Sequence, residues 1–72
     1  MTELKVGRSY QAATGYIIPR SKLSTNNGVK YAIFEILKLE PNGHYIKKLT
    51  TLSPKEIRAA LELDKNERIA II

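Results

Sequence analysis

Basic and aromatic side chains with no acid among them are the most distinctive chemistry of this sequence. Between Glu3 and Glu35 there is no acidic residue, while the same stretch holds five Lys or Arg residues and three tyrosines. Cations neutralise phosphates and aromatic rings stack on bases, so such a segment is typical of a nucleic-acid-binding surface. The polar run from Ser21 to Gly28 indicates a mobile basic hairpin tip inside this stretch.

The net charge of +5 is distributed unevenly along the chain. Residues 1–38 carry six Lys or Arg against two Glu, whereas residues 39–72 carry six against five acids. This asymmetry predicts one basic face that meets an anionic partner. The alternative is an ordinary surface charge that favours solubility and has no partner.

The turn residues Asn42-Gly43 predict a two-residue hairpin that fixes the pairing of its two strands. In that register Lys38 lies opposite Lys47, and Phe34 and Tyr45 share their face. Opposed lysines repel, which favours a visiting anion between them. Alternatively, Phe34 is buried and the lysines lie at the edge of the core. The expected ligand is nucleic acid in the form of single-stranded DNA or RNA. The residues expected to bind it are Arg8, Tyr10, Arg20, Lys22, Lys30, Phe34, Lys38, Tyr45 and Lys47.

Residues for catalysis or metal binding are scarce. His44 is the only histidine and lies in a predicted turn, and there is no cysteine. A metal site needs further ligands, and a nucleophile needs a base beside it. The glycines do not have the glycine-lysine spacing of a phosphate-binding loop. We therefore expect no enzyme activity, no metal and no cofactor.

The length of 72 residues predicts one small domain, residues 1–72, with a marginal core. The absence of cysteine favours a reducing cytoplasm. No apolar run approaches the roughly 20 residues that span a membrane. The first residues also lack the apolar centre of a signal peptide.

Turn and cap signals predict a mainly β fold with one helix, in the order β-β-β-α-β. Strands are expected at Val6–Ile18, bent at Gly15, and at Val29–Leu39, Tyr45–Leu52 and Glu67–Ile72. The run Ser53-Pro54-Lys55-Glu56 predicts a capped helix that ends near Leu63. A small curved sheet or a partly open barrel of the oligonucleotide-binding type fits this order.

The segment Pro54-Lys55-Glu56-Ile57-Arg58, followed by Leu61, Leu63 and Glu67-Arg68-Ile69, resembles part of a known family. It is similar to the helix and following strand of the swapped-hairpin DNA-binding domains of bacterial transition-state regulators and some antitoxins. The resemblance covers about a quarter of the chain and implies, as an alternative fold, a DNA-binding dimer.

A second functional hypothesis starts from the apolar segment Ile69–Ile72. A hydrophobic strand at a sheet edge offers a template for another strand. The chain would then be a protein-interaction module, either a homodimer or a small regulator or inhibitor of an acidic protein.

Overall fold

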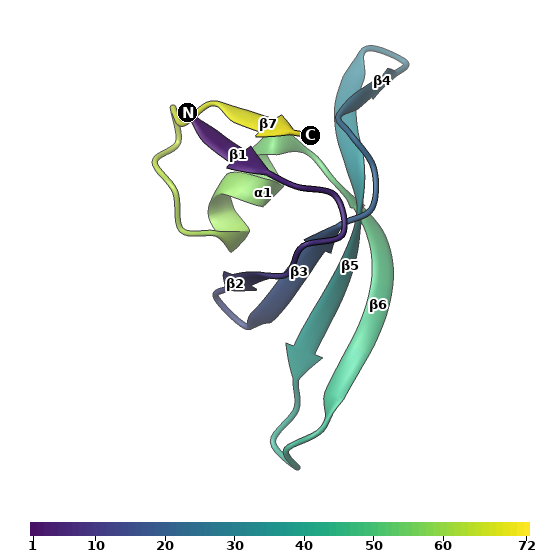
Figure 1. Cartoon of the computed structure of the whole chain (residues 1–72), viewed down its shortest axis with the longest axis vertical. Helices are drawn as coiled ribbons and strands as arrows, with labels where there is room; N and C mark the ends of the chain where they lie inside the picture. Colours follow the sequence, from purple (N-terminus) through teal and green to yellow (C-terminus); the bar gives the residue numbers. More distant parts are fainter.

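The strand β5, Val29–Leu39, is the centre of the larger sheet (Figure 1). Along one edge it pairs antiparallel with β3 and β4, and along the other with β6. The computed structural model describes residues 1–72 and contains seven strands and one helix. The other elements are β1 (Thr2–Leu4), β2 (Tyr10–Ala12), β3 (Gly15–Pro19), β4 (Ser24–Asn26), β6 (Tyr45–Leu52), α1 (Pro54–Ala60) and β7 (Ile69–Ile71).

The single first strand expected at Val6–Ile18 is wrong, because the chain reverses within it. β2 and β3 form a hairpin in which Ala12 lies opposite Gly15. Gly15 has φ 154°, and a Cβ atom there would lie 2.0 Å from the Leu37 carbonyl oxygen. Glycine is therefore required at this point, where β3 approaches β5 closely.

The two predicted hairpin turns differ in outcome. Asn27 and Gly28 have positive φ and join β4 to β5 through a two-residue turn, as predicted. The second turn is longer than expected: the Glu40 amide donates to the His44 carbonyl, and the Gly43 amide donates to that of Glu40. Proline after Glu40 suits the first corner of a type I turn, and Gly43, at φ 86°, takes the left-handed position after it.

This longer loop shifts the predicted register of β5 and β6 by one residue. Lys38 lies opposite Ile46, Leu37 opposite Lys47, and Phe34 opposite Thr50. A shift by one residue moves every side chain of a strand to the other face relative to its partner. Lys38 and Lys47 therefore point to opposite faces, and the predicted lysine pair does not exist.

The hydrophobic core lies on the face of β5 that carries Ala32 and Phe34, not on the predicted face of Ile33 and Leu37. Leu52 and Ile17 lie on the same face as Ala32 and Phe34 through the pairing of β6 and β3 with β5. Ser53 accepts a hydrogen bond from the Glu56 amide, and the Glu56 carboxylate accepts one from the Ser53 amide, so the predicted capping box is confirmed. The core consists of Leu4, Ile17, Ala32, Phe34, Leu52, Ile57 and Ile71.

The C-terminal strand β7 is shorter than predicted and pairs in parallel with β1, a strand that the sequence pattern did not indicate. Leu4 and Ile71 are paired directly and both lie in the core. The mainly β architecture with one helix is confirmed, and neither of the two sheets closes into a barrel. The only helix is far too short to cross a membrane.

Substitutions at the neighbouring residues Phe34 and Ile33 can distinguish the observed core face of β5 from the predicted one. Phe34 is 0% exposed and Ile33 is 37% exposed. Phe34→Ala should lower the free energy of unfolding by about 3–5 kcal/mol because it leaves a cavity. Ile33→Ala should cost less than about 1 kcal/mol. Urea unfolding of the two variants measures both values, and a larger loss for Ile33→Ala would contradict the observed register.

Candidate functional site

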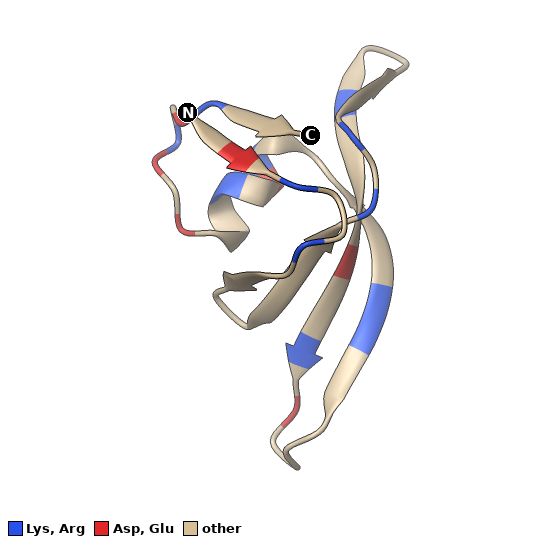
Figure 2. Cartoon of the chain, viewed as in Figure 1, with Lys and Arg blue, Asp and Glu red and all other residues tan.

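The predicted nucleic-acid-binding residues do not gather on one face. Lys and Arg residues are spread over the loops, α1 and the two long strands (Figure 2). Arg8 lies in the exposed loop between β1 and β2, and Lys22 in the exposed loop before β4. Lys38 and Lys47 occupy opposite faces of the β5–β6 hairpin. The expectation of one basic platform on this hairpin is therefore wrong.

Two of the three predicted stacking rings are engaged within the fold. Phe34 is fully buried, so it cannot stack on a base, and the alternative of a core role is confirmed. Tyr10 packs against the core, and its hydroxyl accepts a hydrogen bond of 2.6 Å from the Lys5 amide. Tyr45 is exposed on the outer side of the hairpin, where its ring centroid lies 6.3 Å from that of Tyr16. Only Tyr45 of the predicted set remains accessible to a ligand, together with Tyr16.

The cations Arg20 and Lys47 flank a single carboxylate. Arg20 Nη2 lies 3.0 Å from Glu35 Oε2, and Lys47 Nζ lies 3.3 Å from Glu35 Oε1. Arg20 Nε also donates to Glu35 Oε2. The Arg20 hydrogen bonds, with a smaller contribution from Lys47, hold the pKa of Glu35 below its ordinary value of 4.5, although partial desolvation opposes the shift. This arrangement compensates much of the positive charge that Arg20 and Lys47 would offer to phosphates.

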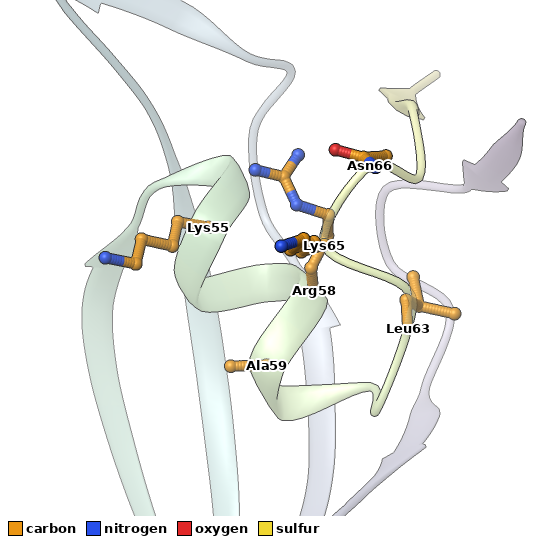
Figure 3. A pocket seen from close by; sticks show the side chains of 6 residues that line it. All are labelled: Lys55, Arg58, Ala59, Leu63, Lys65 and Asn66. Atoms are coloured by element: carbon orange, nitrogen blue, oxygen red, sulfur yellow. The ribbon is translucent and has the colours of Figure 1, made fainter.

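A different group of cations converges beside α1, in the half of the chain where charge is nearly balanced. Lys55 and Arg58 from α1, with Lys65 and Asn66 from the following loop, line a cavity of about 470 Å³ (Figure 3). In that view Arg58 and Asn66 point toward one another and Lys55 extends to the side. No acidic side chain lines this cavity, so its three cations attract an anion without local competition.

A second cavity adjoins the first and shares Arg58 and Asn66 with it. It adds two cations, Lys30 from β5 and Arg68, and one acid, Glu67. Glu67 is already engaged: the N-terminal ammonium lies 3.3 Å from its carboxylate, and the Thr2 hydroxyl donates to it. These contacts, led by the Thr2 hydrogen bond, lower the pKa of Glu67. We call the five positive residues around both cavities the cation cluster: Lys30, Lys55, Arg58, Lys65 and Arg68.

The fold positions this cluster through the helix cap and one backbone contact. The capping box starts α1 at Pro54, so Lys55 and Arg58 stand one turn apart on the helix surface. Arg58 Nη1 donates to the Glu67 carbonyl oxygen at 3.3 Å, which ties the loop to the helix. Lys30 is the only predicted site residue in the cluster. The sequence carries a partial signal, since Lys-x-x-Arg occurs three times, at Lys5–Arg8, Lys55–Arg58 and Lys65–Arg68, and the last two lie in the cluster.

The structure contains no candidate metal-binding site. No group of three or more His, Cys, Asp or Glu side chains lies close enough together to hold a metal ion. His44 lies in the exposed loop between β5 and β6, where its amide donates to the Asn42 side chain.

The pKa of Glu35 gives a test of the ion-pair geometry. Since the folded pKa lies below 4.5, the ion pairs stabilise the fold above that pH, and this stabilisation is lost as the pH falls through the folded pKa. Arg20→Gln should raise the Glu35 pKa more than Lys47→Gln does. Carboxyl ¹³C NMR titration measures both shifts, and an unchanged Glu35 pKa in Arg20→Gln would contradict the geometry.

Neither a protein-family model, nor a curated protein, nor a solved structure matches this chain. What its surface binds has therefore to be inferred from its own charge and shape.

Proposed function

We propose that this protein binds nucleic acid by neutralising backbone phosphates at the cation cluster. The observation that carries the proposal is the convergence of five cations around two adjoining cavities that share Arg58 and Asn66. Phosphate contacts from Lys and Arg supply most of the affinity of non-specific nucleic-acid binding. The net charge of +5 adds long-range attraction to the same ligand.

The chemistry of the cluster suits a chain of phosphates. Arg58 offers a planar guanidinium that can hold one phosphate through two hydrogen bonds, although one of its nitrogens already contacts the Glu67 carbonyl. Lys55 and Lys65 provide flexible point charges around the same opening, and the Asn66 amide offers a neutral donor. The adjoining cavity extends this surface toward Lys30 and Arg68, so that successive phosphates can be held.

Base stacking has a smaller role in this mechanism than the sequence pattern predicts. No aromatic side chain lines either cavity of the cluster. The exposed tyrosines are Tyr16 on β3 and Tyr45 on β6, and Tyr45 begins β6 at the end of the β5–β6 hairpin that is far from α1 (Figure 1). We therefore assign the affinity to charge, with little sequence preference. Single-stranded ligands would gain from the tyrosines only if they extended from the cluster to the hairpin.

One likeness supports the same class of ligand. The segment that resembles swapped-hairpin DNA-binding domains, from Pro54 to Ile69, contributes four of the five cations. This is an analogy of pattern, and the positions of the cations carry the proposal.

The proposal predicts a strong dependence of affinity on salt and on two specific lysines. Lys55→Gln with Lys65→Gln should weaken binding of a labelled oligonucleotide at least about tenfold at low salt. Each lost phosphate contact should also flatten the plot of log K against log salt concentration by about 0.7–0.9. Fluorescence anisotropy with single-stranded and duplex ligands measures both quantities.

A matched control separates the cluster from general charge. Lys22→Gln with Lys38→Gln also removes two positive charges, but from exposed sites outside the cluster. This double variant should change the affinity only slightly. Equal losses in the two double variants would show that binding depends on net charge alone. No binding of the unmodified protein at low salt would refute the proposed function.

A further inference from the structure

The side of the larger sheet that faces away from the core is rich in exposed apolar side chains. Leu49 is 67% exposed, and Leu39 and Tyr45 are each 51% exposed. Because side chains alternate along a strand, these residues share one face of β3, β5 and β6. We call this surface the outer face; its apolar members are Tyr16, Ile18, Ile33, Leu37, Leu39, Tyr45 and Leu49.

The apolar side chains of the outer face are neighbours on three strands, with Glu35 and Lys47 among them, in contrast to scattered single residues, which are normal on a protein surface. Leu39 lies opposite Tyr45 across β5 and β6, and Tyr16 lies opposite Leu37 across β3 and β5. The rings of Tyr16 and Tyr45 meet above β5 at a centroid distance of 6.3 Å. Five of these seven side chains are more than a third exposed, and exposed apolar side chains gathered on adjacent strands mark an interaction site.

The charges of the outer face suit contact with an identical face. Glu35 is its only acid, and it is shared by Lys47 and Arg20. The net charge of this trio is only +1, in a protein of net charge +5. The cation cluster lies elsewhere, around α1 and the loop before β7. Two outer faces can therefore meet without bringing together the charges that would repel most strongly.

The small core gives a reason for such a contact. Only eight of the 72 residues are buried, and the chain has neither a cysteine nor a cluster of metal ligands. Domains of this size commonly require disulfides, metals or oligomerisation, because one small core supplies little stability. Of these three, oligomerisation is the route that an exposed apolar sheet face provides.

We propose that the outer face packs against the outer face of a second copy of this chain. The two sheets would lie about 10 Å apart, as in a β-sandwich, around a two-fold axis. A standard interface buries about 800 Å² per partner, which is about a sixth of the 5110 Å² surface of this chain. The free edge of β6 is a poorer contact, because the adjacent Lys47 and Lys48 disfavour edge-to-edge pairing. A dimer of this kind would leave both cation clusters accessible.

Sedimentation velocity without nucleic acid tests the proposal, so its result is independent of the proposed function. The unmodified protein should show a dimer that dissociates on dilution. Leu49→Lys should weaken the dimer by at least tenfold, whereas Ile46→Lys should leave it unchanged. Ile46 is a matched control, since it is 53% exposed and lies on the same strand β6, opposite Lys38 and therefore on the other face of the sheet. A monomer at millimolar concentration, or a dimer unaffected by Leu49→Lys, overturns the proposal and leaves the outer face to a different protein partner.

Crosslinking covers the case in which Leu49→Lys unfolds because the monomer is unstable. The chain has no cysteine, so Leu49→Cys and Ile46→Cys each introduce a single thiol. Under mild oxidation Leu49→Cys should form a disulfide-linked dimer much faster than Ile46→Cys at equal concentration. Equal rates would show that the outer faces do not meet, and would overturn the proposal.

Discussion

The fold depends on the backbone pairing of β5 along both of its edges. β3 and β4 hold one edge and β6 holds the other, so the side chains of β5 have fixed directions. Ala32 and Phe34 are thereby committed to the core, and the alternate residues Ile33, Leu37 and Leu39 to the outer face. The close approach of Gly15 to the Leu37 carbonyl is part of the same constraint, since any side chain at Gly15 would separate β3 from β5. Core, outer face and ion pairs all follow from this one strand.

Local signals in the sequence predict those parts of the fold that local chemistry decides. Ser53, Pro54 and Glu56 locate the start of α1, and Asn27-Gly28 locates a hairpin, because caps and tight turns involve only neighbouring residues. The loop at Pro41–Gly43 shows where local signals stop being sufficient. Two turn types fit the same residues, and they give registers of β5 and β6 that differ by one residue. β1 was missed because three residues, Thr2–Leu4, become a strand only by pairing with β7.

The sequence indicates the positive charge of the candidate site but not its location in the fold. Composition indicates an anionic ligand, and that inference needs no coordinates. The location depends on how distant segments meet: Lys30 comes from β5, Lys55 and Arg58 from α1, and Lys65 from the next loop. Local balance by acids such as Glu67 conceals this convergence in the sequence, whereas in the fold that carboxylate is engaged by the N-terminal ammonium and Thr2. The acid-free stretch that dominates the sequence instead supplies core residues such as Ile17 and Phe34.

The parallel pairing of β1 with β7 has a consequence for how the chain folds during synthesis. Leu4 is synthesised long before Ile71, yet it is paired with Ile71 in the finished core. The hairpins around β5 can form early, because their strands are close in sequence. Until β7 has emerged, the nascent chain leaves Leu4 without this partner. During that interval the aggregation risk of this protein depends on the speed of translation rather than on its final stability.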